Sequence, residues 1–272
     1  MSDHVCWIYE DDAAFDDAVR AFLTGGLERG EQLLCVGERV IDSLRGQPQP
    51  FGDVDALIAD GVLRTLTHAQ AHEAAGAFAP ENQLAYYDAA TRSAIEAGYR
   101  GLRVIAEISV LAADPAVRPE LVRCEHVADD YIAQGTGFTA MCAYRAELER
   151  EALDDVATVH PLVHGPDGVP PFRVFFDHDR LVLAGGVDTF SAARLAQVLE
   201  SSPVVAGGVV LDLSLTQFVD VAACRVLARW ARDLRGRDLD VEVRNASPLF
   251  RRMWRILALD ELVPITFAGS AA

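Results

Sequence analysis

The sequence contains no lysine, and all 24 of its basic residues are arginine. This absence excludes Schiff-base chemistry, a lysine general base and the phosphate-binding lysine of a P-loop, and no Gly-x4-Gly-Lys-Ser/Thr motif is present. The chain also lacks a Cys-x-x-Cys pair, and no apolar run approaches the roughly 18–20 residues needed to cross a bilayer. We therefore expect neither a nucleotide-binding P-loop nor a membrane-spanning segment.

The cysteines and the distribution of charge indicate the redox environment of the protein and limit the classes of partner that it can bind. The five cysteines lie mostly in apolar, strand-like stretches: Cys6, Cys35, Cys124, Cys142 and Cys224. Their odd number, with an acidic amino terminus that lacks an apolar signal core, indicates reduced thiols and a cytoplasmic location. Residues 1–160 hold 28 acidic residues against 12 arginines, whereas residues 161–272 hold 13 against 12. This acidity disfavours binding to nucleic acid or to an anionic membrane surface.

The length of 272 residues suffices for two domains, each with its own core. In the first part, apolar stretches predict strands at 4–9, 32–36, 62–66, 102–108 and 137–143. Helices are predicted at 13–29, 41–44, 54–60, 81–97, 119–134 and 147–156, with Asp12 capping the first and a Gly/Pro-rich loop at 46–52. Apolar strands that alternate with helices indicate an α/β domain with a doubly wound, mostly parallel sheet.

Proline and glycine mark a boundary between the two parts. Residues 159–171 are predicted to link a first domain, 1–158, to a second one, 172–272, and we expect His160 and His164 in this linker to face solvent. The second domain is predicted to contain strands at 172–177, 180–187, 208–214 and 239–244, with helices at 190–202, 221–235 and 248–261. It is therefore a second α/β domain.

Four stretches of the first domain point to a known family. They are His4–Tyr9, Gly26–Glu31, Ala97–Ser109 and Met141–Tyr144. With these stretches, residues 3–150 resemble the MEDS family of sensory domains, named from methanogens and methylotrophs. The resemblance implies that the domain senses a small organic ligand, which for the family is proposed to be a simple hydrocarbon derivative.

The carboxyl ends of the strands are where ligands bind in open α/β sheets. This rule selects eight candidate ligand-binding residues: Tyr9, Glu10, Glu38, Arg39, Glu107, Ser109, Tyr144 and Arg145. Glu107 is the most informative, because a carboxylate in an apolar strand is costly unless it is paired or hydrogen-bonded. It either contacts a ligand or pairs inside the fold with Arg103, Arg145 or His4.

A metal site is the alternative for the first domain, although we expect no cofactor. His4 and Cys6 are two residues apart on a predicted strand, so both side chains point to one face. Cys142 on a neighbouring strand and Glu107 would complete a zinc or iron site. His68 and His72 are four residues apart, and we interpret them as surface residues of a helix.

The second domain carries motifs of its own. Leu183–Asp188, Val209–Ser214, Phe218–Asp220 and Asn245–Pro248 follow one another in a fixed order. With these motifs, residues 172–262 resemble the STAS domain of anti-sigma-factor antagonists. In that family the residue after the aspartate is a serine or threonine that a partner kinase phosphorylates, whereas here it is Val221. The resemblance implies a docking surface without the usual phosphorylation site.

The predicted docking residues lie at the start of one helix: Asp220, Val221, Ala222, Arg225 and Arg229. The resemblance implies a partner that is an anti-sigma factor or a histidine-kinase-like ATPase protein, and it is compatible with a homodimer. We predict a non-enzymatic signalling regulator in which the first domain senses a small organic ligand and controls the second. Two alternatives stay open: a metal- or thiol-dependent redox sensor or enzyme, and a structural scaffold that assembles through the STAS domain.

Overall fold

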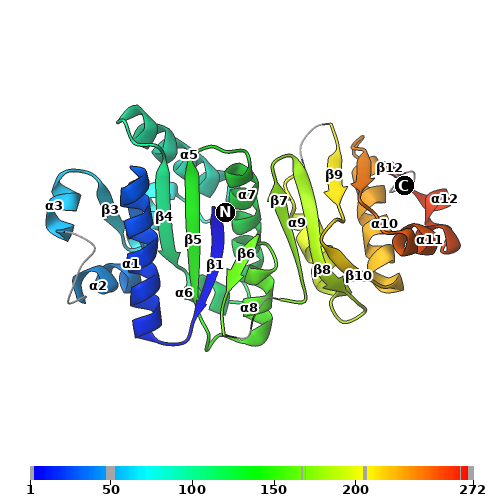
Figure 1. Cartoon of the computed structure of the whole chain (residues 1–272), viewed down its shortest axis with the longest axis horizontal. Coiled ribbons are helices and arrows are strands. Elements are labelled where there is room, and N and C mark those ends of the chain that lie inside the picture. Colours follow the sequence, from blue (N-terminus) through cyan, green and yellow to red (C-terminus); the bar gives the residue numbers. More distant parts are fainter. Residues whose placement is uncertain are drawn as a thin grey trace.

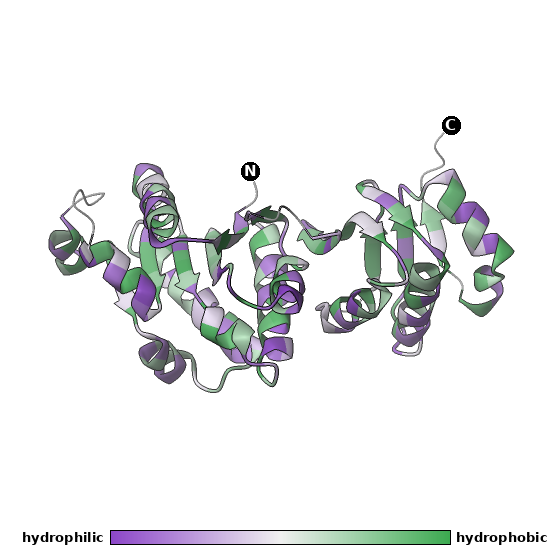
Figure 2. Ribbon diagram, turned by 90° about the horizontal axis from the view of Figure 1, so that it is seen from below, coloured by the Kyte–Doolittle hydropathy of each residue, from purple (hydrophilic) through white to green (hydrophobic). Residues whose placement is uncertain are grey.

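The computed structural model describes residues 3–46, 53–166, 168, 170–204, 207–263 and 265–268. Two sheets, each flanked by helices, follow one another along the chain (Figure 1). Viewed from below, they form two lobes with apolar residues concentrated on the strands and on the inner faces of the helices (Figure 2). The predicted pair of α/β domains is therefore confirmed. The predicted loop at 46–52 lies, except for Gly46, outside the described residues.

The first sheet has six parallel strands in the order β3-β2-β4-β5-β1-β6. The strands are β1 (His4–Tyr9), β2 (Gln32–Val36), β3 (Leu63–Leu66), β4 (Leu102–Glu107), β5 (Phe138–Arg145) and β6 (Leu162–His164). The last strand corrects the sequence prediction. β6 lies in the segment predicted as a linker, yet it pairs with β1 through Cys6 and Val163 and so belongs to the first sheet.

Helices cover both faces of this sheet. α1 (Asp12–Arg29), α2 (Glu38–Gly46) and α3 (Val54–Ala59) pack on one face, and α4 (His68–Ala75), α5 (Pro80–Glu96), α6 (Ser109–Ala113), α7 (Arg118–Ala133) and α8 (Arg150–Ala157) pack on the other. Asp11, not Asp12, caps α1, because its carboxylate accepts the N–H of Ala14. No range was predicted for helix α4, apart from the interpretation of His68 and His72 as residues of one helix, and Thr67 and Gln70 form a capping box at its start.

The second sheet has the order β10-β8-β9-β11-β12, with β7 antiparallel to β8. Its strands are β7 (Phe172–Asp177), β8 (Arg180–Val187), β9 (Val209–Asp212), β10 (Thr216–Val219), β11 (Val241–Arg244) and β12 (Thr266–Ala268). Its helices are α9 (Ala192–Ser201), α10 (Val221–Arg235), α11 (Pro248–Ile256) and α12 (Leu259–Leu262). The helix predicted at 248–261 is two helices, because Ala258 adopts the left-handed conformation with φ 51°.

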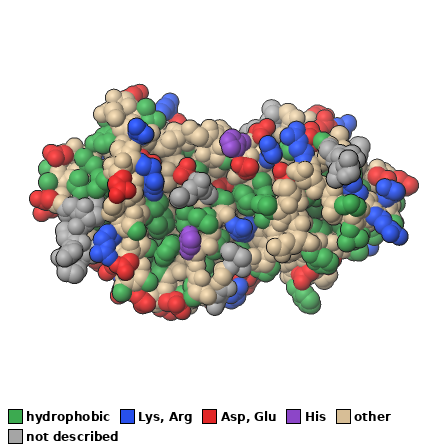
Figure 3. All heavy atoms as spheres, in the orientation of Figure 1, with side chains coloured by type: hydrophobic (Ala, Val, Ile, Leu, Met, Phe, Trp, Pro, Cys, Tyr) green, Lys and Arg blue, Asp and Glu red, His purple; other side chains and the backbone are tan. Residues whose placement is uncertain are grey.

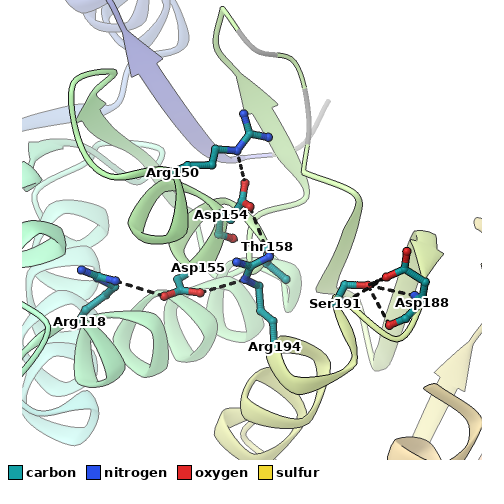
Figure 4. Close-up of polar contacts among 8 residues, drawn as sticks. All are labelled: Arg118, Arg150, Asp154, Asp155, Thr158, Asp188, Ser191 and Arg194. Atoms are coloured by element: carbon teal, nitrogen blue, oxygen red, sulfur yellow. Dashed lines mark hydrogen bonds and ion pairs between the residues drawn. The ribbon is translucent and has the colours of Figure 1, made fainter. Parts of the chain in front are cut away.

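The two domains share a buried interface built around α7, which packs against β7 and α9. The buried carboxylate of Asp129 on α7 accepts the backbone N–H of Phe176 on β7 at 2.6 Å. At the edge of the interface, Arg194 of α9 contacts Asp155 at 3.0 Å and Asp154 at 3.4 Å (Figure 4). A change in the position of α7 would therefore alter its contacts with the second domain.

Candidate functional site

A cavity of about 390 Å³ lies between the sheet and the helices α4, α5 and α7. Its walls are mainly apolar and aromatic, as shown by Phe78, Leu84, Tyr87, Leu121 and Phe138. The volume falls within the range of about 300–1,000 Å³ that is typical of small-molecule pockets. The cavity is therefore suited to a small, mostly apolar organic molecule.

The residues predicted at the carboxyl ends of the strands form a separate, closed cluster. Tyr9 donates its hydroxyl to Glu107 Oε1 at 3.1 Å, and the hydroxyl of Ser109 bonds the same oxygen. Ser109 Oγ in turn accepts the backbone N–H of Arg145 at 2.8 Å. Burial and the carboxylate of Glu107 raise the pKa of the Tyr9 phenol. The carboxylate of Glu107 is thus satisfied inside the fold, and its partners are Tyr9 and Ser109 rather than the predicted Arg103, Arg145 or His4.

The other predicted ligand residues are also placed outside the cavity wall. Glu38 pairs with His68 Nδ1 at 2.6 Å, and Arg39 pairs with Asp12 and Asp16 across α1. Glu10 is exposed, and Tyr144 points to the opposite side of the sheet from Tyr9. None of the eight predicted residues, all of which are described, lines the cavity.

His68 connects the strand ends to the cavity. It lines the cavity wall, and its Nε2 lies 2.7 Å from the backbone carbonyl oxygen of Glu107. His68 is partly exposed, with 30% of its side chain accessible, and His72 is exposed, while both also line the cavity.

A cluster of buried polar side chains lies at the inner wall of the cavity, where Glu125 and Cys142 line it. His4 lies between two carboxylates, with Nδ1 3.0 Å from Asp129 and Nε2 3.2 Å from Glu125. Burial alone would lower the pKa of His4, but its hydrogen bonds to Asp129 and Glu125 raise it to about 9. Burial would likewise raise the pKa of Glu125, yet contacts with His160 and His4 hold it well below its usual range. His4 is therefore a buried imidazolium held by two carboxylates.

His160 belongs to this cluster rather than to a solvent-facing linker, so the expectation is wrong for His160, whereas His164 is exposed as expected. The side chain of His160 is completely buried, because β6 folds the following residues onto the first sheet. Burial and the neighbouring charge of His4 lower the pKa of His160. Of the predicted metal-ligand candidates, His4 and Cys142 meet here, whereas Glu107 lies among the strand-end residues and Cys6 is not one of the convergent side chains.

Sequence reasoning missed Glu125, Asp129 and His160. The signal for the first two was present, because residues four apart share one face of a helix and this face of α7 also carries the apolar residues Val122 and Ile132. Two carboxylates on such a face require buried partners, and His4 in an apolar strand was one candidate.

The predicted docking residues cluster at the start of α10. Asp220 caps this helix by accepting the N–H of Ala223 at 2.9 Å, and it also accepts the hydroxyl of Thr189 at 2.8 Å. That contact holds the loop bearing Phe190, whose side chain is 95% exposed, beside the helix start. Val221 is also exposed.

Two exposed arginines, Arg225 and Arg229, lie on α10 of the second domain. On the face drawn in Figure 3, arginine side chains also gather over α11, and acidic side chains are spread around the margin of the first domain. The aromatic residues Trp230, Phe250 and Trp254 are buried.

Two of the sequence expectations concern the state of the cysteines and the lack of a membrane-spanning segment. The five cysteines are all free thiols. No helix in the described part of the chain is long and apolar enough to span a membrane.

Comparison with known proteins assigns both domains. Residues 3–161 match the family described as the methanogen/methylotroph, DcmR sensory domain (MEDS), and residues 174–264 match the family described as Mlab, STAS domain. No curated protein matches the chain. The two resemblances inferred from the sequence are confirmed in the same order. The combination is that of a signalling or regulatory protein whose STAS module binds partner proteins. The chain belongs to the MEDS family and carries a STAS domain directly after its sensory domain.

Proposed function

We propose that the protein is a non-enzymatic, cytoplasmic signalling regulator in which a small apolar ligand, bound in the MEDS cavity, changes how the STAS domain docks a partner. The observation that supports this proposal is the position of α7. Leu121, Ala128 and Tyr131 of this helix line the cavity, while the same helix packs on β7 and α9 of the STAS domain.

The ligand acts through a difference in affinity between two positions of α7. A ligand shifts a conformational equilibrium only by as much as its affinities for the two states differ. Apolar contacts in the cavity supply such a difference when the helix moves, because buried apolar area contributes about 25 cal/mol per Å². Asp129, which joins α7 to the backbone of Phe176, carries the movement to the STAS sheet.

The docking surface is the apolar start of α10, bordered by Arg225 and Arg229. Exposed apolar side chains there include Phe190 and Phe218, and large aromatic side chains often dominate binding energy at interfaces. The partner is an anti-sigma factor or a histidine-kinase-like ATPase protein. Because Val221 has no hydroxyl, docking here is not switched by phosphorylation at this position.

Binding of the fluorescent apolar probe N-phenyl-1-naphthylamine to the purified full chain tests the sensory half of the proposal. Ala128→Phe places a ring in the cavity and should lower probe affinity at least tenfold. Ala85→Phe, on an exposed position of α5 outside the cavity wall, should leave it unchanged. Equal affinities for the two variants would show that the probe binds elsewhere.

Amide hydrogen exchange of β7 tests the coupling. Saturating probe should change the exchange rate of the Phe176 amide in the wild type and not in Ala128→Phe. No change in the wild type, together with concentration-dependent self-association that the probe does not affect, would favour the alternative of a scaffold that assembles through the STAS domain.

A further inference from the structure

Four buried side chains from four segments of the MEDS domain converge on one point. They are His4 on β1, Glu125 on α7, Cys142 on β5 and His160 after α8. Each is at most 6% exposed. One nitrogen, oxygen or sulfur atom of each lies within 4.8 Å of the corresponding atom of every other. The proposed ligand-sensing function makes no use of this convergence.

The distances among these atoms are close to those of a tetrahedral coordination shell. The Oε2 atom of Glu125 lies 3.2 Å from His4 Nε2, 3.0 Å from Cys142 Sγ and 3.4 Å from His160 Nε2. Cys142 Sγ lies 3.8 Å from His4 Nε2. Ligands of a tetrahedral zinc ion, at bond lengths of about 2.0–2.3 Å, are separated by about 3.3–3.8 Å. An ion therefore fits among these atoms with small shifts of the side chains.

Each of three ligands is oriented by a second contact on its far side. His4 Nδ1 faces the carboxylate of Asp129 at 3.0 Å, and His160 Nδ1 faces the backbone carbonyl oxygen of Val156 at 2.8 Å. Tyr144 donates its hydroxyl to Glu125 Oε1 at 3.1 Å, which leaves Oε2 for the centre. Such outer contacts fix the tautomer and ring orientation of metal-bound histidines in proteins.

One atom of the cluster lacks a hydrogen-bond partner among the described residues. His160 Nε2 is completely buried, and its 3.4 Å approach to Glu125 does not form a hydrogen bond. Buried polar atoms without partners are rare in folded proteins and each requires an explanation. A metal ion at the centre would accept the lone pair of this nitrogen.

We propose that His4, Glu125, Cys142 and His160 bind a zinc ion in a tetrahedral site at the inner wall of the cavity. Zinc would displace the proton on His4 Nε2 and the thiol proton of Cys142 to solvent. The resulting set of two neutral imidazoles, a thiolate and a carboxylate suits zinc, whereas magnesium and calcium prefer oxygen ligands alone. The ion would tie α7 to the sheet, and His160 would tie the start of the interdomain segment to the same point. Zinc can do this whether or not the cavity is filled, so failure of the proposed ligand sensing would not entail failure of the zinc site.

Zinc titration into the full chain, after treatment with a chelator and dialysis, tests the proposal by competition with a chromophoric chelator. The wild type should bind one zinc ion per chain. Cys142→Ser and His160→Gln should each weaken binding by more than about 100-fold, and Asp129→Asn by about 10–100-fold. Cys35→Ser is the matched control, because Cys35 is an equally buried cysteine in the core on the opposite face of the sheet, and it should bind like the wild type.

Cobalt substitution keeps the test decisive if a ligand variant fails to fold, which circular dichroism would show. Cobalt in the wild type should give a thiolate-to-metal charge-transfer band and the visible bands of a tetrahedral ion. Absence of the charge-transfer band would overturn the assignment of Cys142. Zinc binding that is unchanged in His160→Gln, or that is lost in Cys6→Ser alone, would overturn the proposed ligand set.

Discussion

Replacing Asp129 should destabilise the protein more than replacing any exposed carboxylate, because this residue joins the two domains inside their common core. It is 1% exposed, and its two oxygens bond the imidazolium of His4 and the backbone N–H of Phe176. Asp129→Ala leaves the N–H without an acceptor and removes one of the two carboxylates that balance His4. Breaking a buried ion pair from one side costs about 3–5 kcal/mol.

Asp129→Asn should cost less than Asp129→Ala. The amide oxygen can still accept one hydrogen bond, so only the charge and one charged hydrogen bond are lost, at about 1.5–3 kcal/mol. Both losses are large against a total free energy of unfolding of about 5–15 kcal/mol.

Urea unfolding followed by tryptophan fluorescence measures these changes in chelator-treated protein, so that bound metal does not contribute. Asp130→Ala is the matched control. The carboxylate of Asp130, the next residue in the chain, is only half-buried and accepts a hydrogen bond from Gln134 at the end of the same helix. That control should change the free energy of unfolding by no more than about 0.5 kcal/mol. If Asp129→Ala costs no more than Asp130→Ala, the interface does not depend on this carboxylate and the reasoning fails.

Three further substitutions test the fold. Asp220→Ala removes a helix cap and should lower the free energy of unfolding by about 1 kcal/mol. Burial opposes the shift, but hydrogen bonds to the Asp220 carboxylate lower its pKa in the folded protein. The difference in unfolding free energy between wild type and variant should therefore shrink as the pH falls below about 4, which acid titrations of stability would measure. Gly101→Ala would place Cβ 2.0 Å from the carbonyl oxygen of Gly137 and should cost about 1–3 kcal/mol in urea unfolding, whereas Gly46→Ala, which meets nothing within 4 Å, should not destabilise. Arg194→Ala should cost only about 1 kcal/mol by the same assay, since both carboxylates that it contacts keep a second arginine partner (Figure 4).

The strands of both sheets that were predicted correctly are those with continuous or alternating apolar residues. β1, β2, β7 and β8 have the predicted bounds because their pattern is strong over five residues or more. The short strands β6, β10 and β12 carry only three or four residues and each includes a polar residue, so neither a continuous apolar run nor a clear alternation marks them. Prolines around β6 further suggested a linker, although pairing with β1 supplies its stability.

The candidate site was less predictable than the fold. The rule that ligands bind at strand ends selected Glu107 and Tyr9, which bond each other, and missed the cavity. The cavity lies between the sheet and the helices α5 and α7. No local sequence pattern predicts the distance between a helix and the sheet on which it packs. His4 and Cys142 were recognisable as polar groups in apolar strands, whereas His160 joins them only because the chain returns to the sheet at β6.

Helix α7 contacts the cavity, the buried cluster of polar side chains and the STAS domain. Ala128 lines the cavity, Glu125 faces the proposed zinc ion, and Asp129 holds the STAS backbone at Phe176. Because packed interiors rearrange between discrete positions rather than deforming continuously, a ligand that repositions α7 must alter the proposed metal site and the interface together. Coupling between binding sites is reciprocal, so a partner that prefers one position of α7 must change the affinity of the cavity by the same factor. The structure thus favours a single shared helix over a flexible linker as the route from sensor to docking surface.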